Sequence, residues 1–171
     1  METPPEEINL LRGSLILLQK LRHLSANKNL KIEALMRSTK MEDTPFIREL
    51  YHAFCNQALY RETIVEYLEE ECSTASPDSP DDLTPLIIGQ LLLCVEDEIL
   101  ETPKVREFAI QSGMNASHRS LRINITHILH RLARRGDSEA LSVLKKLSTN
   151  VYVRVKENAQ YMLAELAQET D

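Results

Sequence analysis

The sequence predicts an all-α protein of about seven to nine helices in one domain that spans residues 1–171. Of the 171 residues, 43% are hydrophobic, four are glycine and none is tryptophan. Leu, Ala, Glu, Lys and Arg are abundant, and these residues lose little on entering a helix. A chain of this length can bury a core without a metal or a disulfide. Helix signals recur from end to end, which favours a single helical domain.

In the N-terminal half, helices are expected over about 3–25, 30–38 and 43–72. The first and the third follow a cap residue and an early proline, at Thr3-Pro4 and Thr44-Pro45, which is typical of a helix start. Apolar residues then recur at helical spacing. The segment 73–82 is rich in Ser, Pro and Asp, and is therefore expected to be a polar loop.

In the C-terminal half, the most apolar segment runs from Leu83 to about Leu100 and is expected to be one central, nearly enclosed helix. Glycine and cap residues then predict four further helices. These run from Thr102-Pro103 to Gly113, from Asn115-Ala116-Ser117 to Gly136, over Ser138–Ser148 with Asp137 or Ser138 as the cap, and over Val151–Gln168.

The last two expected helices carry a family resemblance. The segment 144–147 (Leu-Lys-Lys-Leu) is followed by the pair Val153-Arg154 and by a small residue, Ala159. This pattern resembles the HEAT repeat, in which two antiparallel helices pack together and a Val-Arg pair begins the second. The family usually places an Asp in the turn to partner that Arg, whereas Asn150 stands nearby in this chain.

The same pattern recurs upstream. A shift of 34 residues aligns Leu121–Ala133 with Val155–Ala167, with identities at Asn, two Leu and Ala. The first expected helix offers a weaker third copy. The resemblance implies a short α-solenoid of antiparallel helix pairs, of HEAT/armadillo type, whose second helices form an extended binding surface. Another interpretation is that the chain is the terminal part of a larger solenoid, with its N-terminal helices docking on further repeats of a larger complex.

Charge is distributed unevenly along the chain. Residues 1–101 contain 9 Lys and Arg against 19 Asp and Glu, a net charge of −10, whereas residues 102–171 contain 11 against 7, a net charge of +4. The C-terminal part is therefore expected to present a basic ridge to a partner, with solvated helix faces as the plainer interpretation. The candidate partner-binding residues are Arg119, Arg122, His127, Arg131, Arg134, Arg135, Arg154, Lys156 and Gln160.

No catalytic, cofactor or metal motif is recognisable. Phosphate-binding and nucleophile-elbow glycine patterns are absent, and so is the His-Glu-x-x-His zinc motif. His127 and His130 lack ligands at fitting spacing and are expected to be surface or half-buried histidines. The odd number of cysteines, three, and the lack of a signal peptide or membrane span predict a protein of the cytoplasm or nucleus.

These observations favour a non-enzymatic scaffold or adaptor, without a cofactor, that binds a peptide or helix of a partner protein, acidic where it meets the basic ridge, and no membrane. The first alternative is a helical-repeat protein whose basic ridge contacts nucleic acid phosphates. The second rests on the segment 132–137 (Leu-Ala-Arg-Arg-Gly-Asp), which resembles the L-x-x-x-G-D core of the death-promoting helix of apoptosis regulators. A helix-ending Gly followed by a helix-capping Asp explains the same letters.

Overall fold

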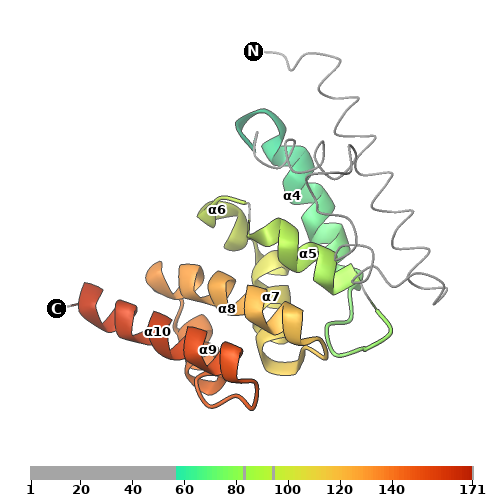
Figure 1. Cartoon of the computed structure of the whole chain (residues 1–171). Helices are drawn as coiled ribbons and strands as arrows, with labels where there is room; N and C mark the ends of the chain where they lie inside the picture. The colour runs from blue at the N-terminus through green and yellow to red at the C-terminus, as the bar shows by residue number, and fades with distance from the viewer. Residues whose placement is uncertain (1–56, 83, 94, 171) are drawn as a thin grey trace, which may run out of the picture.

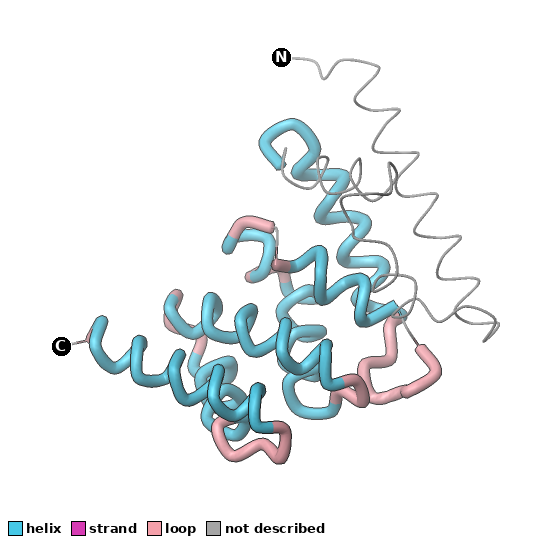
Figure 2. Tube along the Cα trace, in the orientation of Figure 1, coloured by secondary structure: helices cyan, strands magenta, loops and turns pink. Residues whose placement is uncertain are grey.

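The computed structural model describes residues 57–82, 84–93 and 95–170. The expected helices over 3–25 and 30–38, and the first part of the one expected over 43–72, lie outside these residues. All regular structure in the described residues is helical, as the sequence predicts, and Figures 1 and 2 show no strand there. The helices are α4 (Gln57–Thr74), α5 (Thr84–Leu92), α6 (Asp97–Leu100), α7 (Pro103–Asn115), α8 (Arg119–Arg134), α9 (Ser138–Leu147) and α10 (Val153–Glu169).

The longer helices lie in two layers. Helix α8 packs beside α5 on one side and α10 on the other, and these three helices form the front layer in Figure 1. Helices α4, α7 and α9 also pack side by side, and each contacts the front helix that follows it in the chain. The short helix α6 contacts α7 and α8. Helix α8 is therefore the central element, and its contacts reach both layers.

The core lies between these layers. One cluster of buried apolar side chains includes residues from all seven described helices. Its largest fully buried members are Ile64 and Leu68 in α4, Ile88, Leu91 and Leu92 in α5, Ile99 and Leu100 in α6, and Leu121, Ile125 and Ile128 in α8. Burial of such side chains is the main favourable term in folding, so α8 is fixed in place by several neighbours at once.

Burial repeats along the C-terminal helices. Residues that are 34 positions apart occupy equivalent buried places in α8 and α10, and again in α7 and α9. The pairs are Leu121 and Val155, Ile125 and Ala159, Ile128 and Met162, Ala109 and Val143, Ile110 and Leu144, and Gly113 and Leu147. The shift found in the sequence thus relates six pairs of buried residues, although others that it pairs differ, such as Leu129, which is buried, and Leu163, which is half-buried.

The apolar segment 83–100 is not the single helix that the sequence predicts. Helix α5 ends at Leu92, and α6 begins at Asp97 after Glu96 adopts an extended conformation. Arg131 of α8 donates hydrogen bonds to the carbonyl oxygens of Leu92, at 3.2 Å, and Val95. Because a side chain from another helix satisfies these carbonyls, the backbone can leave the helix without losing its hydrogen bonds.

The predicted helix end at Gly113 is also wrong. Helix α7 continues to Asn115, and Gly113 is buried in it. A Cβ atom at this position would lie 2.7 Å from Cγ1 of Val143 and 2.9 Å from Cδ1 of Leu129. The glycine therefore permits close packing of α7 against α8 and α9, instead of ending a helix.

The turn between α8 and α9 agrees with the prediction. Gly136 has a φ of 92°, a conformation in which residues with a Cβ atom are strained. The Asp137 side chain then accepts hydrogen bonds from the backbone N–H groups of Glu139 and Ala140, and so caps α9. These two roles account for the Gly-Asp letters shared with the death-promoting helix. The predicted loop over 73–82 begins two residues later, because α4 extends to Thr74.

Candidate functional site

The predicted basic ridge separates into two groups at opposite ends of α8. Arg131, Arg134 and Arg135 lie at its C-terminal end, and Arg119 and Arg122 lie in its first turn. Helices α8 and α10 run in the same direction, since Tyr152 at the start of α10 contacts Arg119, while Arg134 pairs with Glu169 at the end of α10. Figure 1 shows the two helices side by side in this orientation.

Arg131 is committed to the fold. Its guanidinium group is 2.7 Å from the Asp97 carboxylate, in addition to its bonds to the carbonyls at the end of α5. The side chain retains 26% exposure. An arginine with a carboxylate and two carbonyl partners has few donors left for a ligand, so Arg131 joins α8 to α5 and α6.

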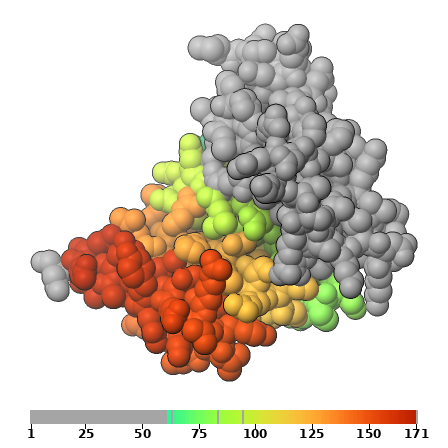
Figure 3. Space-filling view, viewed as in Figure 1, coloured from blue at the N-terminus to red at the C-terminus, as the bar shows by residue number. Residues whose placement is uncertain are grey.

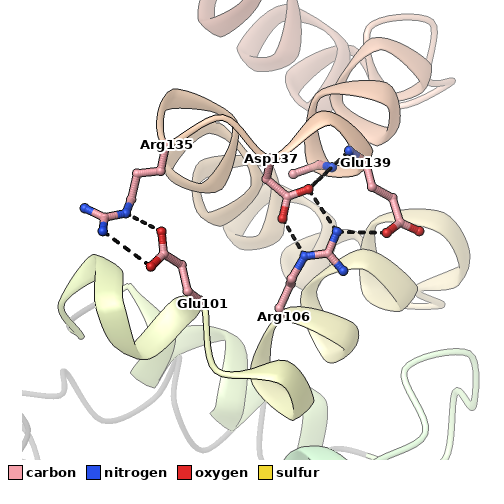
Figure 4. Close-up of polar contacts among 6 residues, drawn as sticks. Glu101, Arg106, Arg135, Asp137 and Glu139 are labelled. Carbon is pink, nitrogen blue, oxygen red and sulfur yellow. Dashed lines mark hydrogen bonds and ion pairs between the residues drawn. The ribbon is translucent and has the colours of Figure 1, made fainter.

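Arg134 and Arg135 are neutralised as well. Arg134 lies 2.9 Å from Glu169, and Arg135 lies 2.5 Å from Glu101 with Glu98 at 3.8 Å. Figure 4 shows the paired contact of Arg135 with Glu101. The hydrogen bonds that Arg135 donates to Glu101 raise the pKa of Arg135, so the pair stays charged. The C-terminal half of the predicted ridge is thus a set of ion pairs.

The N-terminal group has a different setting. The guanidinium carbons of Arg119 and Arg122 lie 5.9 and 5.6 Å from the centroid of the Tyr152 ring, in cation–π contact. The Nε atom of Arg122 also donates a 2.8 Å hydrogen bond to the carbonyl of Ala116. Two arginines of α8 are therefore held on the aromatic ring of the residue that begins α10. No carboxylate lies at hydrogen-bonding distance from them in the described structure.

Arg154 completes this group. It lies in the first turn of α10 and lines an open cleft of about 600 Å³. The space-filling view shows residues of α8 and of α10 exposed on the same face (Figure 3). The other lining residues are Gln90, Ser117, His118, Arg119, Ser120, Ile123 and Asn124. This lining contains two arginines, a histidine and several hydrogen-bonding groups, but no carboxylate.

Ion pairing distinguishes the described arginines. Those with a carboxylate oxygen within 3.6 Å are Arg61, Arg106, Arg131, Arg134 and Arg135. The remaining three, Arg119, Arg122 and Arg154, have no carboxylate partner within the part of the chain that the structure describes. All three lie at the first turns of α8 and α10, so the unpaired arginines are gathered in one place. We call Arg119, Arg122, Arg154 and Tyr152 the arginine cluster.

The other predicted residues lie outside this cluster. Gln160 donates a hydrogen bond to the carbonyl of Ser148, and Lys156 is half-buried on α10. Burial lowers the pKa of His127, and the nearby charges of His130 and Arg154 lower it further. His127 is thus neutral near pH 7 and adds no fixed charge. The described residues include no group of three His, Cys, Asp or Glu side chains placed to hold a metal.

Tyr152 is the member of the cluster that the prediction missed. Its signal is the 34-residue shift, which places Tyr152 over His118, and both residues occupy the N-cap position of their helix. The shift therefore predicts that Tyr152 lies at the same edge of the molecule as Arg119. The ring serves as a support for the arginines.

A second cleft offers less chemistry. It has a volume of about 320 Å³, lies between α4, α7 and the loop after α4, and is lined by Cys72. Burial raises the pKa of the Cys72 thiol to about 12, and the charge of Glu71 adds to this effect. A thiol with so high a pKa is not a nucleophile near neutral pH. The arginine cluster is therefore the stronger candidate site.

Comparison of the chain with protein-family models, with curated proteins and with solved structures finds no match. Among the described helices, none combines the length and the apolar character needed to cross a bilayer. A functional assignment must therefore come from the geometry of the fold and of the arginine cluster.

Proposed function

We propose that this chain is a non-enzymatic scaffold or adaptor of the helical-repeat class, which binds a partner protein on the surface formed by α8 and α10. The observation that carries the proposal is the arginine cluster beside an open cleft. Arginine is enriched at protein interfaces because its planar group makes several directed hydrogen bonds. Three such groups without a carboxylate partner among the described residues have the donors that a partner requires.

Two features support the repeat architecture of HEAT/armadillo type. Six pairs of residues 34 positions apart are buried at both positions, three between α7 and α9 and three between α8 and α10. Ion pairs also join residues about one such interval apart, at 34 residues for Arg131 with Asp97 and for Arg135 with Glu101, and at 35 for Arg134 with Glu169. In a stack of similar helix pairs, each unit contacts the equivalent part of its neighbour, which produces contacts at this interval.

The test reverses the charge of the cluster in the full chain. The variant Arg119→Glu/Arg122→Glu/Arg154→Glu is compared with Lys104→Glu/Lys145→Glu/Lys146→Glu, which makes the same charge change on the exposed lysines of α7 and α9. Both variants are first checked for helicity and cooperative unfolding. Affinity capture with and without nuclease, followed by mass spectrometry, then measures which partners each variant retains.

We expect a discrete protein partner that is retained by the wild type and by the lysine variant, lost by the arginine variant and unaffected by nuclease. Loss from both variants alike would attribute binding to net charge and contradict the proposal. Loss of nucleic acid in place of a protein would favour the phosphate-contacting alternative, because nucleic acid affinity depends on cationic contacts to the backbone.

A further inference from the structure

The charges at the start of α8 and α10 oppose the usual preference of helices. Acidic side chains are favoured in the first turn because the N-terminal end of a helix carries partial positive charge. Helices α6 and α9 follow this rule, whereas the other five described helices have no acidic residue in the first turn. In α8 and α10, the first turns contain arginines without a described carboxylate partner, at Arg119, Arg122 and Arg154. This concentration of positive charge is unfavourable in the isolated chain and becomes favourable when an anion binds.

The arginines are also held in place before any ligand binds. Tyr152 supports two guanidinium groups, and the Ala116 carbonyl fixes the Nε atom of Arg122. An arginine loses side-chain entropy when it grips a ligand, and a group already restrained loses less. The terminal nitrogens of Arg122 make no hydrogen bond to a described residue, so they keep their donors.

The carboxylate of Asp82, in the loop next to the cleft, does not fill the role of the anion. The loop after α4 approaches the cleft, because the Ser117 N–H and His118 ring contact the backbone carbonyls of Pro77 and Pro80. Asp82 of that loop accepts hydrogen bonds from the backbone N–H groups of Ser76 and Thr84. The cleft itself is lined by arginines and neutral polar groups.

We propose that the arginine cluster binds an oxyanion on a side chain of a partner peptide, either a phosphate group or a carboxylate. Both anions have oxygens spaced to accept two hydrogen bonds from one guanidinium group. The serine, asparagine and glutamine side chains of the cleft then contact the peptide around the anion. This inference rests on the proposed scaffold function, and it identifies the chemistry that the partner presents.

A peptide fits the site better than a nucleic acid. A single nucleic acid strand carries a charge about every 3.4 Å, so its binding sites are extended basic surfaces. Here the basic group is compact, and the arginines further along α8 are neutralised by Asp97, Glu101 and Glu169. Tyr152, the aromatic ring of the cluster, has two arginines over it and is only 38% exposed, which leaves little face for a stacked base.

The test titrates the full ¹⁵N-labelled chain with defined probes and follows its amide and arginine Nε signals by NMR. The probes are inorganic phosphate and three short Gly-Ser peptides that differ only in a central pair of phosphoserines, glutamates or serines. A thymidine oligonucleotide is the nucleic acid probe. We expect saturable shifts at residues 118–122 and 152–156 with an anionic peptide, at a dissociation constant of about 1 mM or below, and none with the serine peptide. The phosphoserine and glutamate peptides show which anion is preferred.

Substitutions distinguish binding at the arginine cluster from non-specific electrostatic attraction. Arg119→Gln/Arg122→Gln/Arg154→Gln should weaken peptide binding at least about tenfold, since it removes charge-assisted hydrogen bonds. Lys104→Gln/Lys145→Gln/Lys146→Gln removes the same charge elsewhere and should change affinity less than about twofold. Tyr152→Ala should weaken binding several-fold and Tyr152→Phe should restore it, because the ring and not its hydroxyl supports the arginines.

Three results would overturn the inference: no saturable shift with either anionic peptide, equal weakening by the arginine and lysine variants, or tighter binding of the oligonucleotide. The first result leaves the scaffold proposal standing if the capture experiment still finds a protein partner that depends on the arginines. In that case the partner contacts the cluster through neutral acceptors. Failure of the capture experiment would instead contradict the proposed scaffold function.

Discussion

Asp137 connects two parts of the fold through one carboxylate. It caps α9 and also binds Arg106 of α7, at 2.5 Å from the arginine Nε and 2.9 Å from a terminal nitrogen, as Figure 4 shows. The side chain is 15% exposed. The hydrogen bonds from Arg106 hold its pKa below the usual value despite the opposing effect of burial, and the backbone N–H groups of Ala140 and Glu139 lower the pKa further. A carboxylate with a lowered pKa links folding stability to pH.

We predict that Asp137→Asn lowers the free energy of unfolding by roughly 1–2 kcal/mol at neutral pH, because asparagine keeps the cap but not the charge. The folded state of the wild type prefers the ionised carboxylate. Its stabilising effect is therefore fully present above the unfolded pKa of about 4 and is lost as the pH falls through the lower, folded pKa. Urea unfolding of both proteins between about pH 7 and pH 3 measures the difference, which should shrink towards the acidic end. A constant difference would contradict the role of the charge.

Gly113 gives a second prediction at this scale. Gly113→Ala should destabilise the protein by about 1–3 kcal/mol through crowding of Val143 and Leu129, which outweighs the gain in helix propensity of about 1 kcal/mol. The cost should be smaller in a Val143→Ala background, where space is available. Thermal or urea unfolding of the wild type, the two single variants and the double variant measures both effects in a double-mutant cycle. If Gly113→Ala alone left stability unchanged or raised it, α7 could move away from α8 and α9 without loss of folding free energy.

At the scale of the elements, the contacts of α8 through Arg131 should contribute more to folding stability than its contact through Arg134. We predict that Arg131→Ala costs about 2 kcal/mol of stability, because the carbonyls of Leu92 and Val95 lose a charged donor. Arg134→Ala should cost less than about 1 kcal/mol, since its ion pair with Glu169 is about half exposed on both sides. Urea unfolding compares the two variants directly. Equal losses of stability in the two variants would mean that the contact of Arg131 with the end of α5 does not stabilise the fold.

The elements also show which parts of the fold local sequence can predict. The turn at Gly136 and Asp137 was predictable because a positive φ and a cap depend on adjacent residues. The break after α5 was not, because the partner of its carbonyls is Arg131, which lies 36 or more residues further along the chain. Gly113 misled for a similar reason. Its role depends on Val143 in another helix.

The same distinction applies to the candidate site. The sequence identified a surplus of arginines, but their pairing depends on residues 34 or 35 positions away. Three of the predicted ridge residues are neutralised in this way, and three remain in the arginine cluster. Tyr152 was not among the predicted ridge residues, because a supporting ring resembles any other exposed aromatic in the sequence.

At the scale of the whole molecule, the charge asymmetry of the sequence becomes a set of internal contacts. The acidic residues of α6 and of the segment after it, Asp97, Glu98 and Glu101, face the basic end of α8. Part of the negative charge of residues 1–101 is therefore matched to the positive charge of residues 102–171. Among the described arginines, those at the first turns of α8 and α10 are the ones that this matching leaves without a carboxylate partner.

The free energy of local opening should be lower for α10 than for α8. Helix α8 packs mainly against five helices, whereas α10 packs mainly against α8 and α9. Because each unit of a helical stack is stabilised by its neighbours, a unit covered on one side opens more easily. Native-state hydrogen exchange in low urea should give lower opening free energies for amides of α10 than for those of α8. Identical values for the two helices would indicate a single cooperative unit instead.

The support that Tyr152 gives to the arginines also has an optical consequence. The chain contains no tryptophan, so Tyr152→Trp would introduce a single indole beneath Arg119 and Arg122. Indole is the ring that cations prefer, and the substitution should preserve the contact. Excited selectively, this fluorophore would change its emission whenever an arginine leaves the ring, and so report the state of the surface in real time and without a label.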